Sequence, residues 1–329
     1  MSALLRISDL GVSFGPASVL SHVSLEVGES EIVALVGESG CGKSTLALAV
    51  MGLLPPEASV TGSVRFDGRE LTALAEDERR ALRGDRISMV FQDPATALDP
   101  AFPVGEQVAE TVRAHRPVGR RQAKARALEL LREVGIPDAG RRYGDPPHRF
   151  SGGMQQRVVI ATALANDPAL LIADEPTTAL DVTIQAQILD LLRDLRRRHR
   201  TGILMIAHDL GVVAELCDRA VVLYAGQVVE SAPVGALFAG PHHPYTSALL
   251  SALPSAAQPR GSLATAPGRV PDPADPPPGC RFAPRCPLRR PACERVPALE
   301  PVADGHLMAC WAASELACDE APALARETA

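Results

Sequence analysis

The chain has 329 residues, of which 46% are hydrophobic and only 3% aromatic, so it is long enough for one large domain and a smaller part. Its formal net charge of −6 disfavours a general nucleic-acid binder. The N-terminus lacks the layout of a signal peptide, and no apolar run reaches the roughly 20 residues that cross a bilayer. We therefore expect a cytosolic protein with reduced thiols, which disfavours a disulfide framework.

Two local basic runs occur in this chain, although its net charge is negative. They are RPVGRRQAKAR (116–126) and RRRHR (196–200). Runs of this kind are typical of solvated helix surfaces. We therefore expect no nucleic-acid partner.

The segment around residue 40 predicts a phosphate-binding loop. IVALV (32–36) is typical of a buried parallel strand, and it leads into GESGCGKS (37–44), which matches G-x-x-x-x-G-K-S/T at every fixed position. In such a loop the backbone N–H groups point at a phosphate, and the N-terminus of the following helix adds favourable potential. Lys43 would reach the β- and γ-phosphates, and Ser44 would bind Mg²⁺. The residues that we assign to nucleotide binding here are Gly37, Glu38, Ser39, Gly40, Cys41, Gly42, Lys43, Ser44 and Thr45, with the Cys41 side chain incidental.

A second strand predicts the acidic half of the same site. LLIADEP (170–176) is an apolar strand that ends in Asp174, whose carboxylate can hold the Mg²⁺ shell. Glu175 follows, where it can orient and polarise an attacking water. Acidic residues after a strand can also be mere surface termini, but the phosphate-binding loop favours the catalytic interpretation.

Together with FSGGMQQR (150–157), these motifs resemble the nucleotide-binding subunit of an ABC transporter, over roughly residues 4 to 235. The segment is similar to the family signature, usually written LSGGQ. Ser151, Gly152 and Gly153 are intact, and they would present a hydroxyl and bare amides to an anion at the start of a helix. In the family this element faces the γ-phosphate held by the partner subunit.

The resemblance implies roles for four further residues. Gln92, in MVFQDP, matches the loop that senses Mg²⁺ and contacts the membrane partner. Asp181 ends TTALD (177–181), which matches the loop that crosses the dimer interface. His208 matches the switch histidine near the γ-phosphate, and Phe14 matches the aromatic residue on which adenine stacks.

The resemblance also implies the fold and the domains. We expect an α/β P-loop NTPase, the ABC cassette, with a RecA-like core, an antiparallel β subdomain and a helical signature subdomain, followed by a small cysteine-rich C-terminal extension. Residues 1–235 would form the nucleotide-binding domain and residues 236–329 the extension.

Three classes of ABC protein carry such motifs. A transporter ATPase docks on separate membrane subunits. A soluble ABC-type ATPase of translation or DNA repair usually carries two cassettes, coiled coils or large insertions, and none is visible. A non-catalytic regulatory module would be expected to lose Glu175 or His208, and both are present. The sequence therefore favours the transporter ATPase.

The C-terminal region narrows the choice to importers. HHPYTSALLSALP (242–254) has apolar positions at helical spacing and could be only a docking helix. With the Pro-rich linker 255–279 and GCRFAPRC after it, however, it resembles the extension of oligopeptide and dipeptide importer ATPases. That extension also occurs in relatives that import nickel, glutathione or other small solutes. Peptide import is therefore favoured over these substrates by family analogy alone.

The resemblance implies an assembly on the cytoplasmic face of the bacterial plasma (inner) membrane. Its partners would be two transmembrane permease subunits, a second ABC ATPase, commonly a paralogue, and an extracytoplasmic substrate-binding protein. ATP would lie between the phosphate-binding loop of one ATPase and the Ser151 region of the other.

Four cysteines crowd the tail with the spacing C-x5-C-x6-C-x16-C. They are Cys280, Cys286, Cys293 and Cys310. Zinc sites typically use C-x2–4-C knuckles, so the longer spacing suits an iron–sulfur cluster better, with zinc and free thiols as alternatives. The resemblance implies a 4Fe–4S cluster, whose charge Arg281, Arg285, Arg289 and Arg290 would help to offset. Cys318 lies outside the pattern.

Overall fold

The apolar run IVALV forms strand β3 (Ile32–Val36), all of whose residues are buried. The chain then passes through the glycine-rich loop into helix α1 (Lys43–Met51). The computed structural model describes residues 3–177, 182–252 and 268–312, so Asp181 and Cys318 lie outside the described residues. The chain divides into two compact units.

The first unit comprises Met1–Leu5, Val27–Ile32 and Phe66–Ile206. Its parallel strands run in the order β6, β7, β8, with Val90 opposite Ala173 and Asp174 opposite Ile206. The strands read as continuous apolar runs because both faces of such a sheet are covered. Their bounds are β6 (Ile87–Val90), β7 (Leu170–Asp174) and β8 (Gly202–Ala207).

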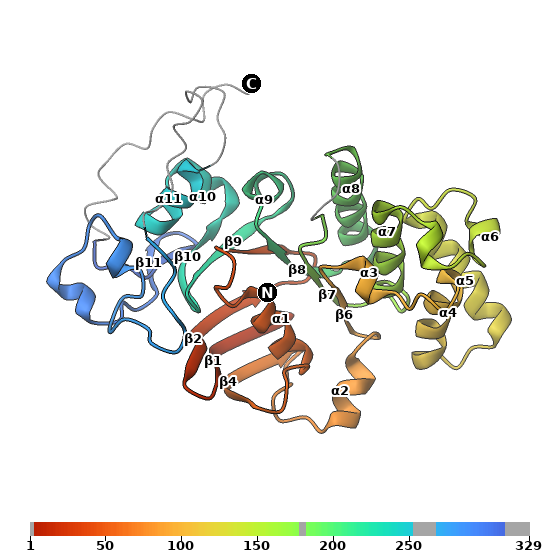
Figure 1. The fold of residues 1–329 in the computed structure, drawn as a ribbon, viewed down its shortest axis with the longest axis horizontal. Helices are drawn as coiled ribbons and strands as arrows, with labels where there is room; N and C mark the ends of the chain where they lie inside the picture. Colours follow the sequence, from red (N-terminus) through yellow and green to blue (C-terminus); the bar gives the residue numbers. More distant parts are fainter. Residues whose placement is uncertain (1–2, 178–181, 253–267, 313–329) are drawn as a thin grey trace. The chain divides into compact units, whose positions relative to one another are not determined.

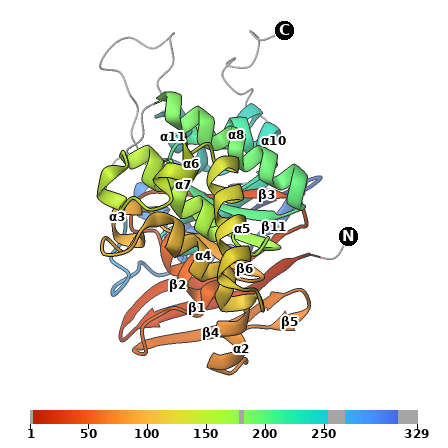
Figure 2. The same cartoon turned by 90° about the vertical axis from the view of Figure 1, so that its right-hand side faces the viewer.

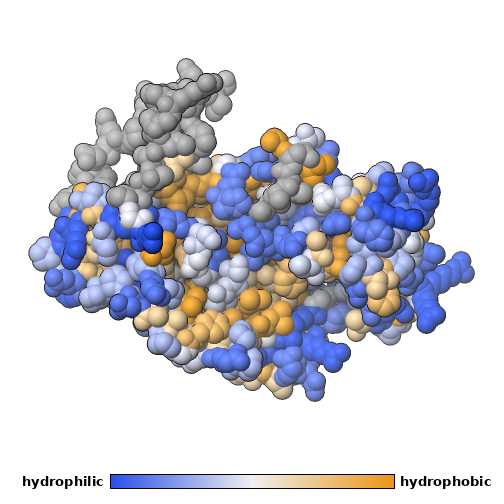
Figure 3. Space-filling view, in the orientation of Figure 1, coloured by the Kyte–Doolittle hydropathy of each residue, from blue (hydrophilic) through white to orange (hydrophobic). Residues whose placement is uncertain are grey.

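The helices of the first unit include three that pack against one another, α4 (Val104–His115), α5 (Arg120–Glu133) and α7 (Gly152–Ala163) (Figure 2). The outer surface of this helical part is largely hydrophilic, at the right of Figure 3. Most of the basic run 116–126 is exposed there, as expected of a solvated helix surface. The other elements of the unit are β5 (Arg69–Glu70), α2 (Glu76–Leu82), α3 (Pro94–Ala97), α6 (Ala139–Arg142), the 3-10 helix η1 (Pro147–Arg149) and α8 (Val182–His199).

The second unit comprises Arg6–Glu26, Val33–Arg65 and Ala207–Ala329. One of its sheets has the order β2, β1, β4 (Figure 1). Polar and buried residues alternate along much of β1 and β2, which is typical of strands with one face on a core. The bounds are β1 (Leu5–Phe14), β2 (Ala17–Val27) and β4 (Ala58–Phe66).

The other sheet of the second unit is mixed. Strand β3 pairs in parallel with β9, and antiparallel pairs then join β9 to β10, β10 to β12 and β12 to β11. The last two strands form a hairpin whose turn contains Gly305 at φ 64°, a conformation that glycine adopts without strain. The extension therefore lengthens the sheet, which the sequence pattern did not predict. The bounds are β9 (Arg219–Tyr224), β10 (Gln227–Pro233), β11 (Glu300–Ala303) and β12 (His306–Met308).

The helices of the second unit are short. They are α9 (Leu210–Leu216), α10 (Val234–Ala239), α11 (Pro244–Ser251) and the 3-10 helices η2 (Ala283–Arg285) and η3 (Pro291–Glu294), in addition to α1. Within the described residues, no helix combines the length and the apolar character needed to span a membrane.

Candidate functional site

The glycine-rich loop takes the shape that its glycines permit. A Cβ atom on Gly37 would lie 2.1 Å from the carbonyl oxygen of Leu223, so only glycine fits against β9. Gly42 precedes α1 at φ 104°, a conformation that L side chains rarely adopt. The loop therefore closes tightly between β3 and α1, as its motif predicts.

Lys43 bridges this loop from within. Its side chain is 7% exposed, and its Nζ donates to the carbonyl oxygen of Gly37 at 2.8 Å and to that of Glu38 at 3.0 Å. Ser44 is exposed and Thr45 half-buried in the first turn of α1. The ammonium group is thus held at the mouth of a helix N-terminus, where an anion is favoured.

Cys41 packs beneath the loop rather than facing a ligand. The residue is 1% exposed, and burial raises the pKa of its thiol, which the Lys43 ammonium partly opposes. Its carbonyl oxygen accepts a hydrogen bond of 2.9 Å from the N–H of Gly226. The side chain is therefore a neutral packing group, in keeping with the expectation that it is incidental.

The acidic strand end lies in the first unit. Asp174 ends β7 and is 5% exposed. Glu175 adopts a left-handed conformation at φ 47°, which costs a non-glycine residue roughly 1–2 kcal/mol. Its N–H donates to the carbonyl oxygen of Ile206 at 3.0 Å, so the turn is held by β8. Backbone strain of this kind is common at functional sites.

The structure brings Gln92 and Glu175 together. The Nε2 of Gln92 donates to the Oε2 of Glu175 at 2.8 Å. The two residues follow β6 and β7, which are neighbours in a parallel sheet, so the carboxyl ends of both strands meet at the same edge. The sequence predicted both residues separately, but not their hydrogen bond.

The signature segment begins helix α7. Ser151 is the N-cap, and its Oγ accepts a hydrogen bond of 3.4 Å from the N–H of Met154. Ser151 and Gly152 are exposed, and nothing lies within 4 Å of a Cβ built on Gly152. A Cβ on Gly153 would instead meet the Ile184 side chain at 2.7 Å. The hydroxyl and the helix start are therefore open on one side and packed on the other.

The remaining predicted residues have less defined surroundings. His208 follows β8 directly and is exposed. Phe14 ends β1 and is half-buried. Gln92, Ser151, Asp174 and Glu175 lie in the first unit, whereas Phe14, the loop around Lys43 and His208 lie in the second.

The four tail cysteines carry free thiols. Burial raises the pKa of the Cys280 thiol to about 11; the backbone N–H of Phe282 opposes this rise, and Cys293 and Cys310 add to it. Among the described residues, however, no group of three or more His, Cys, Asp or Glu is arranged to hold a metal ion. The prediction of an iron–sulfur cluster is not confirmed.

The HPYT segment (243–246) is held by a buried carboxylate that the sequence analysis did not identify. Glu230, on β10, is 0% exposed and accepts hydrogen bonds from the N–H groups of His242 and His243 at 2.7 and 3.1 Å. Its Oε1 also lies 2.7 Å from the Nε2 of His306. Burial raises the pKa of Glu230, but these hydrogen bonds outweigh it and lower the pKa overall.

Two family models match the chain. The ABC transporter model matches residues 20–178, and the model described as the oligopeptide/dipeptide transporter C-terminal region matches residues 229–293.

Relatives match along nearly the whole chain. The probable peptide ABC transporter ATP-binding protein y4tR of Sinorhizobium fredii is 50% identical over 95% of this chain and 96% of its own. The dipeptide transport ATP-binding protein DppD of Bacillus subtilis is 46% identical over 94% of this chain and 95% of its own. The solved dimer of MJ0796, a bacterial ABC transporter cassette, superposes with a TM-score of 0.63 at 31% identity, over 70% of this chain and 98% of that one. This likeness confirms the predicted cassette fold.

Proposed function

The chain belongs to the ABC transporter family as an ATP-binding subunit, and we propose that it hydrolyses ATP to energise uptake of dipeptides or oligopeptides through separate permease subunits. The proposal of ATP hydrolysis rests on the hydrogen bond between Gln92 and Glu175, which restrains the carboxylate that directly follows the buried Asp174. The peptide substrate is supported by the match of the C-terminal region and by the names of the relatives.

Each site residue has a task in this proposal. Lys43 binds the β- and γ-phosphates, and Ser44, Gln92 and Asp174 hold the Mg²⁺ of the MgATP substrate. Glu175 accepts a proton from the attacking water, which it orients. Further contacts to the nucleotide or the γ-phosphate come from Phe14, His208, Asp181 and the Ser151–Gly153 segment, the last from a second ATPase subunit.

The assembly follows from the family. Two permease subunits, a second ATPase and an extracytoplasmic binding protein complete the importer, with this chain on the cytoplasmic face of the membrane. Residues 1–235 form the nucleotide-binding domain and residues 236–329 the extension. The acidic net charge supports the absence of a nucleic-acid partner.

The tail cysteines hold a 4Fe–4S cluster in this proposal. Two observations on the sulfur atoms support it. The Cys310 Sγ accepts a hydrogen bond of 3.4 Å from the N–H of Ala312. Burial raises the pKa of the Cys280 and Cys286 thiols, and backbone N–H groups oppose that rise. Burial is the main cause that raises the pKa of the Cys286 thiol, and the thiols of Cys310 and Cys293 add to this rise. Backbone donors to thiolate sulfur are what an iron–sulfur site uses to tune its potential.

Anaerobic purification tests this cluster. The wild type should be brown, with broad absorbance in the visible range that is lost in Cys286→Ser and kept in Cys217→Ser, a cysteine outside the tail group. Colourless protein with stoichiometric zinc would refute the cluster.

Reconstitution tests the transport function. The chain, co-expressed with its permease and its partner ATPase in proteoliposomes, should hydrolyse ATP faster when a peptide-loaded binding protein is added. Accumulation of labelled dipeptide is the expected result. Accumulation of nickel or glutathione without peptide would refute the proposed peptide substrate. Purification with ribosomes instead of a permease would refute the transporter assignment.

A further inference from the structure

Glu38 of the phosphate-binding loop is held through three separate polar groups. Its N–H donates to the Oη of Tyr245 at 2.9 Å, and its carbonyl oxygen accepts from the Nζ of Lys43 at 3.0 Å. Its Oε2 accepts a hydrogen bond of 3.0 Å from the Nη1 of Arg285. Tyr245 lies on α11 and Arg285 ends η2, so two segments of the C-terminal region act on one residue of the loop.

Arg285 is fixed independently of Glu38. Its side chain is 6% exposed, and it also donates to the Oη of Tyr224 at 3.3 Å. Its guanidinium group lies 5.7 Å from the ring centre of Tyr224 and 6.0 Å from that of Phe282. The rings of Tyr224, Tyr245 and Phe282 pack on one another at 4.6 to 5.5 Å. The charge is therefore presented by a rigid aromatic cluster, which favours a strong, directional ion pair.

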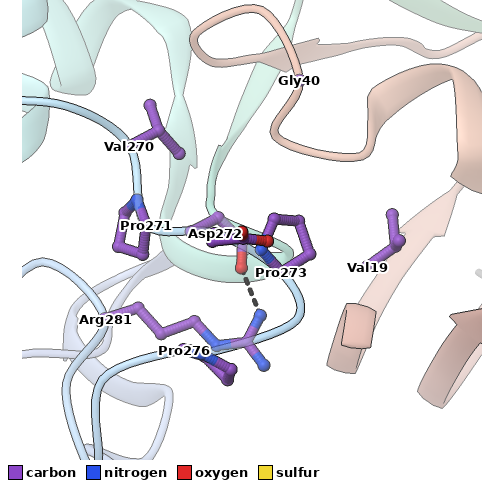
Figure 4. Close-up of a pocket in the computed structure, with 9 residues that line it drawn as sticks. Val19, Gly40, Val270, Pro271, Asp272, Pro273, Pro276 and Arg281 are labelled. Atoms are coloured by element: carbon purple, nitrogen blue, oxygen red, sulfur yellow. Dashed lines mark hydrogen bonds between the residues drawn. The ribbon is translucent and has the colours of Figure 1, made fainter. Parts of the chain in front are cut away.

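Further contacts join the C-terminal region to Ser18 and Ala225. Arg281 donates to the carbonyl oxygen of Ala225 and to the Oγ of Ser18, the latter at 3.3 Å. A pocket opens beside it, with Gly40 of the loop and Val19 on one side and the segment 270–273 on the other (Figure 4). The N–H of Ser18 also donates to the carbonyl oxygen of Pro273 at 2.8 Å. The C-terminal region thus hydrogen-bonds to the loop at Glu38 and lines a pocket together with Gly40.

The charge of Glu38 gives Arg285 a specific task. A carboxylate in a loop that receives a triphosphate repels the ligand unless a cation neutralises it. The pair with Arg285 supplies that cation and turns the carboxylate towards the aromatic cluster. The same residue, through its carbonyl oxygen, aligns the ammonium group of Lys43.

We propose that Arg285 and Tyr245 are positioning residues for nucleotide binding, which act through Glu38 and make ATP affinity depend on the C-terminal region. This rests on the proposed ATPase function. Arg285 touches no nucleotide in this proposal. Its removal should therefore raise the KM for MgATP and leave kcat at saturating MgATP nearly unchanged.

A double-mutant cycle on the full chain tests the proposal, with MgADP as a probe that is not hydrolysed. Arg285→Gln should weaken MgADP binding about tenfold, equivalent to roughly 1.4 kcal/mol. Glu38→Gln supplies the second background of the cycle, in which the charge that needs neutralising is absent. In the Glu38→Gln background, Arg285→Gln should then have no further effect. An equal loss in both backgrounds would mean that Arg285 acts only through folding, and would overturn the proposal.

Three further variants keep the test decisive. Arg285→Lys keeps the charge and should restore most of the affinity, whereas Arg289→Ala, an exposed arginine of the same region, should bind like the wild type. Tyr245→Phe removes only the hydroxyl and should weaken binding a few-fold. Unchanged affinity in both Arg285→Gln and Tyr245→Phe would refute this inference alone. A wild type that binds no adenine nucleotide would instead refute the proposed function.

Discussion

Gln92 and Glu175 are 83 residues apart in the chain, yet the amide of the first donates a 2.8 Å hydrogen bond to the carboxylate of the second. The amide restrains a carboxylate whose backbone already adopts a left-handed conformation. The orientation of the proposed base can therefore be separated from its acceptance of a proton. Two substitutions distinguish these two contributions to hydrolysis.

Glu175→Gln removes the base and keeps a side chain that Gln92 can still contact. Since a positioned base typically contributes about 10²- to 10⁴-fold, hydrolysis should fall at least about a hundredfold, while MgATP still binds. Single-turnover hydrolysis and nucleotide retention measure the two effects. Turnover at the wild-type rate in this variant would contradict the role of Glu175.

Gln92→Ala removes the orienting amide, which is also a proposed Mg²⁺ ligand, and keeps the base. We expect kcat to fall about five- to tenfold, of the order of the 1.36 kcal/mol that corresponds to a tenfold rate change, because the contact is partly exposed. Steady-state ATPase assays of the assembled transporter measure it. Gln122→Ala, an exposed glutamine on α5, is the matched control and should leave kcat unchanged. Equal rates for Gln92→Ala and the wild type would show that the hydrogen bond has no catalytic role.

Lys43→Ala should lose nucleotide affinity itself. The ammonium is a buried cation beside the proposed phosphate position, and charge-assisted hydrogen bonds are worth about 1.5–3 kcal/mol, which corresponds to roughly 10- to 150-fold in Kd. Titration with MgADP measures the loss. A thermal unfolding curve serves as the control for folding. Wild-type affinity in a folded Lys43→Ala chain would refute the phosphate-binding role.

Acidification should destabilise the HPYT segment. Burial lowers the pKa of His243 to about 4, against an ordinary 6.5, and the nearby Glu230 carboxylate opposes this only in part. Above pH 6.5 the ring is neutral in both the folded and the unfolded chain, and the fold keeps its full stability. As pH falls from 6.5 towards 4, the unfolded chain binds a proton that the folded chain does not, so the fold loses stability. At pH 5 the loss is about 2 kcal/mol relative to pH 7.

The measurement is the difference in Tm between pH 7 and pH 5. His243→Asn removes the titrating ring but retains an oxygen that can accept the N–H of Tyr245, which His243 Nδ1 accepts at 3.0 Å. The Tm of the variant should be lower than that of the wild type at pH 7, and it should fall less between pH 7 and pH 5. A Tm difference as large as in the wild type would contradict this cause.

The local features of the nucleotide site were predictable from the sequence because they depend on short-range geometry. The loop before Lys43, the strand that ends at Asp174 and the cap at Ser151 each lie within a few consecutive residues, and the structure has all three. The C-terminal region was less predictable. The hairpin formed by β11 and β12 carries few apolar residues, and it becomes a strand pair because β10 offers an edge.

The long-range pairs could not be read from the sequence. Glu38 and Arg285 are ordinary charged residues, and nothing in their flanking residues indicates that they meet across 247 positions. Glu230 in QVVESAP resembles a solvent-facing residue of an edge strand, yet it is fully buried because His306 and two backbone N–H groups satisfy it. Such partners are set by tertiary packing, which neither propensity nor periodicity encodes.

Because Glu38 and Arg285 lie far apart along the chain, they are also synthesised at different times. A ribosome adds about 5–20 residues each second, so roughly 12–50 s separate the synthesis of these two residues. During that interval the newly made phosphate-binding loop has neither Arg285 nor Tyr245 to hold it. The nascent chain therefore carries an incompletely supported loop until nearly all of it has been translated, and a chain released early lacks that support permanently.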